Sequence, residues 1–216
     1  MSSLLSLDTT TGAAAAPTQH AKQPIVTGTS VLGVKYAGGV LLAADTLCSY
    51  GSMAKYKSAE RLRVVSGGTI IGAGGEYSDF QFIVDDLKKK AQQEACEDDG
   101  GVLDAKGYWN YLRAVMYNRR NQMDPLWNDL IVAGPDFLGF VDKIGTTFQD
   151  NFIATGFGSH LSLPILRDKW RADLTEGEAR TILEDCLRVL FYRDCRALNR
   201  IQIAKVTNEG SVVSEP

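Results

Sequence analysis

Short apolar runs alternate with longer amphipathic stretches along this chain of 216 residues. The first two runs, residues 30–36 and 40–45, flank Ala37-Gly38-Gly39, and the next two, residues 62–65 and 69–74, are split by a Ser-Gly-Gly turn. Two short apolar runs joined by a few Gly-rich residues are typical of a β-hairpin. The first third of the chain therefore predicts two hairpins.

The period of the apolar positions then changes from that of strands to that of helices. Helical spacing predicts helices over residues 76–96 and 105–121, which Asp124-Pro125 follows as a break. Further on, the pattern predicts a short helix over 159–170 and a longer one over 175–195, which opens with the capping-box spacing Thr175-x-x-Glu178. Strand-like runs lie between and after these helices, at residues 126–134, 137–143, 151–156, 200–206 and 211–213.

The order is thus strands, two helices, strands, two helices, strands. Segregated runs of strands and helices favour packed layers over βαβ crossovers. Two antiparallel sheets face to face, with a pair of helices outside each, would bury every apolar face. The sequence therefore predicts an α+β fold, a four-layer α-β-β-α sandwich.

Composition and charge exclude several classes of partner. Hydrophobic residues make up 44% of the chain, and the formal net charge is −3. No block of like charge exceeds three residues, so neither nucleic acid nor an anionic membrane is indicated as a partner. No apolar run reaches the ~20 residues that span a bilayer. His20 and His160 lie far apart and the cysteines do not cluster, so we expect no metal site and no cofactor.

The four cysteines are expected to be free thiols. Cys186 and Cys195 fall in one predicted helix, separated by about 13 Å at ~1.5 Å rise per residue. That separation is too large for a disulfide, and a reducing compartment is indicated. Residues 1–23 are small, polar and unpatterned, without the features of a signal peptide. We expect them to be a disordered leader or a removable pro-segment.

The step Gly28-Thr29 carries the candidate chemistry. A threonine that a cut leaves as the first residue can be a nucleophile, with its own α-amino group as base. A hairpin centred near Gly38 places Thr29 opposite Thr46-Leu47, so Asp45 lies at the same end of the sheet. Arg61 begins another strand that can return to this end. From these residues alone, Thr29 is either a catalyst or a strand residue.

Several segments agree, in order and spacing, with one family. "TGTSVLGVKYAGGVLLAAD" followed by "SYGS", "DPLWNDLIVAG", "ATGFGSHLSLPILRDKW" and "VLFYRDCRALNRIQIAKV" resemble the β-type subunits of the 20S proteasome. The resemblance begins near Thr18 and covers nearly all of the remaining chain. Within the family it is strongest to the subgroup at the seventh position of the β ring. It implies the N-terminal-nucleophile hydrolase fold, whose layers are those expected above.

The resemblance also implies roles for individual residues. Active members have their catalytic threonine at the place of Thr29, aspartates at Asp45 and Asp194, and a lysine at the place of Arg61. Arginine stays protonated at physiological pH and cannot share a proton as lysine can. Serines of active members align with Phe157 and Ala197, which have no hydroxyl, although Ser159 lies two residues beyond Phe157.

The site is therefore expected to be degenerate, because losses from a catalytic set that acts as a unit leave little activity. We expect Asp45 and Arg61 to form a structural ion pair and Asp194 to close the last long helix. Nothing in the sequence ensures a cut after Gly28, and the resemblance implies processing upstream, near Thr18. A peptide-bonded nitrogen at Thr29 is not a base.

The resemblance implies a non-catalytic structural subunit of the 20S core particle in ATP- and ubiquitin-dependent protein degradation. Its partners would be β subunits of the same ring, α-ring subunits and the opposite β ring, in cytoplasm and nucleus. The alternative is an active threonine-type endopeptidase subunit that uses Thr29. A third possibility, an unrelated amidohydrolase or binding module, requires the resemblance to be accidental. The expected organisation is a leader (1–23), one β-type domain (24–207) and a tail (208–216).

Overall fold

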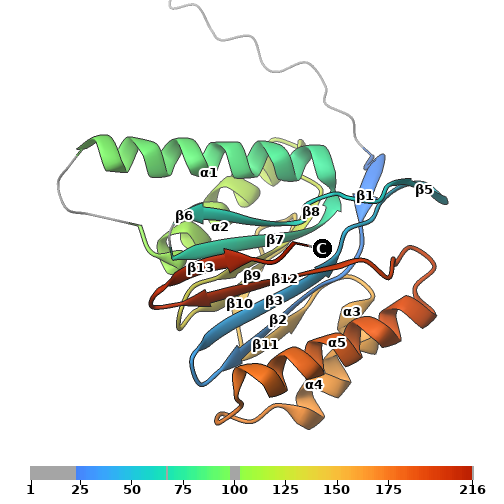
Figure 1. The fold of residues 1–216 in the computed structure, drawn as a ribbon. Helices are drawn as coiled ribbons and strands as arrows, with labels where there is room; N and C mark the ends of the chain where they lie inside the picture. The colour runs from blue at the N-terminus through green and yellow to red at the C-terminus, as the bar shows by residue number, and fades with distance from the viewer. Residues whose placement is uncertain (1–22, 67, 98–102, 216) are drawn as a thin grey trace, which may run out of the picture.

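The computed structural model describes residues 23–66, 68–97 and 103–215 (Figure 1). All but the last residue of the predicted leader lies outside the described residues. Residues 210–213 of the predicted tail form a strand that pairs with the strand before it. The tail is therefore attached to a sheet for part of its length.

Two antiparallel sheets form the centre of the molecule. The larger, of eight strands, has the order β10-β9-β8-β7-β1-β4-β5, and β6 also pairs with β7. The smaller has the order β11-β2-β3-β12-β13. The larger sheet comprises β1 (Val26–Gly28), β4 (Cys48–Tyr50), β5 (Met53–Tyr56), β6 (Leu62–Ser66), β7 (Thr69–Glu76), β8 (Asn128–Ala133), β9 (Leu138–Val141) and β10 (Thr147–Gln149). The smaller comprises β2 (Val31–Tyr36), β3 (Gly39–Asp45), β11 (Phe152–Ala154), β12 (Ile201–Thr207) and β13 (Gly210–Val213).

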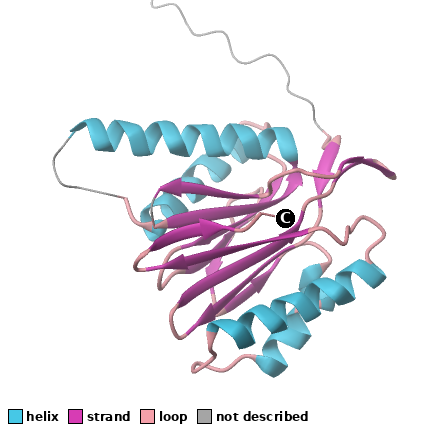
Figure 2. Ribbon diagram, viewed as in Figure 1, coloured by secondary structure: helices cyan, strands magenta, loops and turns pink. Residues whose placement is uncertain are grey.

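Helices lie on the outer side of each sheet (Figures 1 and 2). The first two pack on the larger sheet and the other three on the smaller one. Their bounds are α1 (Tyr77–Glu97), α2 (Ala105–Asn121), α3 (Gly158–Leu161), α4 (Leu163–Lys169) and α5 (Glu176–Arg193). The prediction of an α+β fold with two antiparallel sheets is confirmed.

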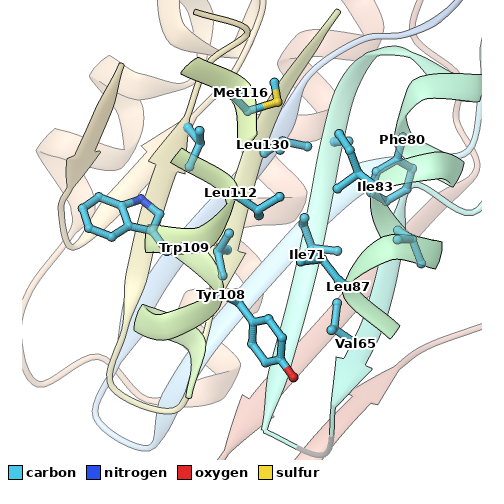
Figure 3. Close-up of a cluster of buried hydrophobic side chains, with 14 of the residues drawn as sticks. Val65, Ile71, Phe80, Ile83, Leu87, Tyr108, Trp109, Leu112, Met116 and Leu130 are labelled. Atoms are coloured by element: carbon cyan, nitrogen blue, oxygen red, sulfur yellow. The ribbon is translucent and has the colours of Figure 1, made fainter. Parts of the chain in front are cut away.

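The helical spacing in the sequence accounts for which side chains are buried. Phe80, Ile83 and Leu87 of α1 point toward the same cluster as Leu112 and Met116 of α2, above the larger sheet (Figure 3). A second cluster fills the space between the two sheets, and a third lies between the smaller sheet and its helices. Three apolar clusters thus separate successive layers, and burial of this apolar surface is the main favourable term in folding.

Several elements differ from the sequence expectation. Residues 159–170 form two helices, α3 and α4, because Pro164 in the first turn of α4 starts a new helix. The sequence pattern did not predict β1, β4, β5 and β10, each of three or four residues. Runs this short show too little alternation for a pattern to reveal. The long helix is as expected: Thr175 and Glu178 form the capping box that begins α5.

Candidate functional site

Thr29 lies where the chain passes from one sheet to the other. Strand β1 ends at Gly28 in the larger sheet, where Gly28 pairs with Cys48 and Gly75. Strand β2 begins at Val31 in the smaller sheet. The chain passes back between the end of β3 at Asp45 and the start of β4. Two crossings therefore bring Thr29 and Asp45 to the same end of the two sheets, as expected from a hairpin centred near Gly38.

The buried side chain of Arg61 bonds to both of these crossings and so links them. Its side chain is only 1% exposed, although it is the charged residue just before β6. The guanidinium donates to the carbonyl oxygens of Thr29 (2.8 Å), Ser30 (3.0 Å), Ala73 (3.2 Å) and Asp45 (2.9 Å). It also forms an ion pair with the Asp45 carboxylate. The planar fork of arginine suits this arrangement, because it presents five N–H groups in fixed directions.

The Asp45 carboxylate is fully engaged by these neighbours. Its second oxygen accepts a hydrogen bond from the backbone N–H of Leu198 at 2.9 Å. Burial raises the pKa of the Asp45 carboxyl, while Arg61 and the Leu198 N–H act in the opposite direction. Asp45 thus ties β3 to Arg61 and to the loop after α5, and among the described residues its carboxylate makes no hydrogen bond with the Thr29 hydroxyl.

The Thr29 hydroxyl points to a different carboxylate. It donates to Oδ2 of Asp194 at 2.5 Å, across 165 positions of sequence. Asp194 is buried and ends α5, and its other oxygen accepts the backbone N–H of Arg196 at 2.9 Å. The backbone N–H of Asp194 donates to the carbonyl oxygen of Leu190 at the helix end, while the carboxylate is held by the following turn. Asp194 therefore closes α5, as expected, and also anchors Thr29.

A second group of polar residues supports the crossing at Thr29. Thr155 accepts the backbone N–H of Val31 at 2.9 Å, and Ser30 accepts that of Gly158 at 2.9 Å. Gly74 passes so close that a Cβ there would lie 2.7 Å from the Thr29 carbonyl oxygen. The backbone around Thr29 is thus fixed from three sides.

Thr29 lines an open cleft of about 570 Å³. Its other walls include Gly75, Asp129, Phe157, Asp194 and Cys195. Burial raises the pKa of the Asp129 carboxyl, and Lys143 opposes that shift. The cleft has room for a short segment of polypeptide. Among the described residues, however, the Thr29 hydroxyl bonds to the Asp194 carboxylate, which also accepts the backbone N–H of Arg196.

The positions expected to carry serines in an active site offer no hydroxyl to Thr29. Phe157 is 57% exposed and lines the cleft, and Ser159 donates to the carbonyl oxygen of Gly156 at 2.6 Å. Ala197 lies in the loop after α5, where its N–H donates to the carbonyl oxygen of Asp194 at 3.1 Å. Thr29, Phe157 and Asp194 thus meet at the cleft, Asp45 and Arg61 lie beneath it, and Ala197 lies beside Asp194.

The described residues contain no group of three or more His, Cys, Asp or Glu side chains placed to hold a metal ion. Over the same residues, no helix has the length and apolar character needed to cross a bilayer.

Sequence reasoning missed the groups that act through the backbone. Ser30 and Thr155 stand in apolar strand-like runs, where a single hydroxyl gives no signal of its own. Glu76, at the end of β7, accepts hydrogen bonds from the backbone N–H groups of Ile25 and Val26. Only the pairing of β1 with β7 brings Glu76 to these residues, so the sequence held no cue.

A family model described as "Proteasome subunit" matches residues 25–206. The chain belongs to the proteasome subunit family. "Proteasome subunit beta type-4" of Arabidopsis thaliana is 48% identical over 202 residues, which cover 92% of this chain and 82% of the relative. The protein of the same name from Xenopus laevis is 43% identical over 208 residues (94% and 86%), and "Proteasome subunit beta type-7" of Saccharomyces cerevisiae is 40% identical over 207 residues (89% and 77%).

This proteasome subunit is therefore of the β type, in the group of the beta type-4 proteins. The family match includes Thr29, Asp45, Arg61 and Asp194, together with all the residues that line the cleft. The resemblance read from the sequence is confirmed at the level of the family and of this group.

Proposed function

We propose that this proteasome β subunit is a non-catalytic, structural subunit of the 20S core particle. The observation that carries the proposal is the strand just before Thr29. Strand β1 lies between β7 and β4 and pairs with both. With β1 in place, the nitrogen of Thr29 belongs to a peptide bond with Gly28, and an amide nitrogen cannot serve as the base for the Thr29 hydroxyl.

The attachment of β1 supports this proposal further. The Glu76 carboxylate accepts the N–H groups of both Ile25 and Val26. A cut after Gly28 would free a strand that lies between two others. It would leave backbone groups of the buried Cys48 and Ser49 in β4, and of the partly buried end of β7, without their strand partners. A processing site upstream of residue 24 leaves these bonds intact, so we infer that maturation does not expose Thr29.

The residues around Thr29 support the same function. Arg61 stands where an active member has a lysine, and its guanidinium is engaged with four backbone carbonyl oxygens and Asp45. It cannot accept a proton at physiological pH. Phe157 and Ala197 supply no hydroxyl. In this proposal Thr29, Asp45, Arg61 and Asp194 keep a structural role, and the chain is not an enzyme by itself.

The proposal extends to the fold type, the domain bounds, the partner subunits and the cellular location. The layers would form the N-terminal-nucleophile hydrolase sandwich, with residues 24–207 as one domain, 1–23 as a leader and 208–216 as a tail. The subunit would contact β subunits of its own ring, α-ring subunits and the opposite β ring. It would act in the cytoplasm and the nucleus, in ATP- and ubiquitin-dependent protein degradation.

Replacement of Thr29 by alanine tests the proposal. In cells that express only the variant, particles containing Thr29→Ala should cleave every class of peptide substrate at the wild-type rate per particle. Thr29→Ser, which keeps a hydroxyl, is the matched control for assembly. Selective loss of one cleavage class in Thr29→Ala, with normal particle yield, would favour the alternative of an active threonine-type endopeptidase subunit. A chain found only as a free monomer in cell extract would contradict the proteasome assignment itself.

A further inference from the structure

Helix α2 has a buried face and a basic outer face. Tyr108, Leu112 and Met116 point into the apolar cluster above the larger sheet (Figure 3). The exposed positions follow helical spacing on the other side, at Lys106, Asn110, Arg113, Tyr117 and Arg120. The 17 residues of α2 include four lysines and arginines and no acidic residue. This is unusual in a chain whose formal net charge is −3.

A groove runs beside this face. Its volume is about 480 Å³, and it lies between α2 and the turn that joins β9 to β10. Asn110, Arg113, Ala114 and Tyr117 line it from the helix, and Ile144 lines it from the turn. Two of these residues are large and about half exposed, because Tyr117 is 54% exposed and Ile144 is 49% exposed. Large apolar side chains that flank a groove mark a binding surface more often than isolated ones do.

The groove has a fixed wall. Asp142 accepts the backbone N–H groups of Ile144 (2.9 Å) and Thr146 (2.8 Å), which sets the shape of the turn. Gly145 adopts φ +85°, and a Cβ there would lie 2.9 Å from Cβ of Tyr117. The turn therefore packs directly on the helix. Both N–H groups bond to the same oxygen of Asp142, Oδ1, and Asp142 is not among the residues that line the groove.

Two cations of this face, Lys106 and Arg113, have no charged partner among the residues that the structure describes. Within the described residues, no hydrogen bond or ion pair involves the side chains of Lys106 or Arg113. Arg119 differs, because it pairs with Asp124 at the end of the helix. No acidic residue is among those that line the groove. An apolar groove with an unpaired guanidinium at its wall is complementary to a segment that carries both an apolar and an acidic side chain.

We propose that this groove, lined by Asn110, Arg113, Ala114, Tyr117 and Ile144, is an interface for an acidic and apolar segment of another proteasome subunit. An apolar side chain of that segment lies between Tyr117 and Ile144, and a carboxylate meets Arg113. The inference rests on the proposed function, because it takes its partner from the assembled particle. It goes beyond that function by naming the surface and the chemistry of the partner segment.

A photo-crosslinker tests the position of the interface. Benzoylphenylalanine replaces Asn110 at the groove, and in a matched control it replaces Lys89 on the exposed side of α1. Both chains are purified within assembled particles, irradiated and digested, and the linked peptides are sequenced. The expected result is one dominant link from position 110 to a segment of another subunit that contains aspartate or glutamate beside apolar residues, without that link from position 89.

A competition experiment tests the charge. Arg113→Glu and the control Lys89→Glu each change one exposed helical cation by the same amount. When either variant is expressed together with the wild-type chain, Arg113→Glu should be about tenfold under-represented in particles, because like charges across an interface repel strongly. Lys89→Glu should enter particles in proportion to its expression. Exchange of the partner acid for lysine should restore the incorporation of Arg113→Glu.

The outcomes separate this inference from the proposed function. If both position variants enter particles and position 110 gives no link, links a segment without acidic residues, or links another copy of this chain, the groove assignment is wrong and the structural role stands. Equal incorporation of Arg113→Glu and the wild type would also overturn the assignment. If neither the wild type nor the Lys89 control enters any particle, the proposed function fails instead.

Discussion

The buried guanidinium of Arg61 should contribute more to folding than any other charged side chain of the site. Its five hydrogen bonds go to four backbone carbonyl oxygens and one carboxylate. Arg61→Met would leave those carbonyls unpaired and the Asp45 charge buried with only the Leu198 N–H beside it. Breaking a buried ion pair by removal of one partner costs about 3–5 kcal/mol, so the free energy of unfolding should fall by that amount.

The conservative variant gives a smaller, calculable effect. The ammonium group of Arg61→Lys has three N–H donors, so it can replace at most three of the five bonds. Two lost bonds at about 0.5–1.5 kcal/mol each predict a loss of about 1–3 kcal/mol. Arg61→Lys should also fail to create activity, because Thr29 keeps its peptide bond to Gly28. An epoxyketone probe that reacts with N-terminal threonines should not label this variant in the particle.

Urea unfolding followed by tryptophan fluorescence measures these differences. Arg63→Met is the matched control, because Arg63 is 38% exposed and pairs with Glu60 at the surface. Its loss should change the free energy of unfolding by no more than about 1 kcal/mol. In the double variant Arg61→Met, Asp45→Asn, removal of the stranded charge should recover about 1–3 kcal/mol. A single Arg61→Met variant within about 1 kcal/mol of wild type would refute the reasoning.

Three further changes have defined outcomes. Gly75→Ala should destabilise the fold by more than about 2 kcal/mol, since Gly75 has φ +89° and its Cβ would lie 2.0 Å from the Trp127 carbonyl oxygen; Gly177→Ala, in open space on α5, should be neutral or stabilise by up to about 1 kcal/mol in the same urea assay. Thr175→Ala should cost about 1 kcal/mol through loss of the capping box, whereas Thr175→Ser should retain it; equal losses would contradict the capping role. Burial raises the pKa of the Cys48 and Cys186 thiols to about 11, so these two thiols should react slowly at pH 8. Iodoacetamide at that pH should modify the exposed Cys96 and Cys195 of the isolated folded chain, and should modify the other two only after urea is added. Peptide mass spectrometry measures which cysteines are modified.

Much of the fold was predictable because most of its helices and strands are encoded in local patterns of apolar, polar and turn residues. The first hairpin has the expected turn, with Tyr36 opposite Gly39. The α1 and α2 helices begin and end within one residue of the expected bounds. The strands β1 and β4 were missed because each has three residues and is stabilised by partners far along the chain. Their existence depends on tertiary pairing, which a local period does not contain.

In the site, too, contacts that depend on local register were predictable and contacts between distant segments were not. The proximity of Thr29 and Asp45 followed from hairpin register, and the Asp45–Arg61 ion pair is present. The hydrogen bond from Thr29 to Asp194 joins residues 165 positions apart, so no local pattern could favour Asp194 over Asp45 as the partner of Thr29. Most contacts of Arg61 are with backbone oxygens, which every residue type carries. No side-chain pattern could have indicated them.

The mass of this chain in mature, probe-treated particles tests the central claim most directly. After treatment with an epoxyketone that modifies N-terminal threonines, top-down mass spectrometry should find a chain that begins upstream of residue 24, retains Gly28-Thr29 and carries no adduct. The active subunits of the same particles, which should carry the adduct, are the internal control. A chain that begins at Thr29 and carries the probe would contradict the account.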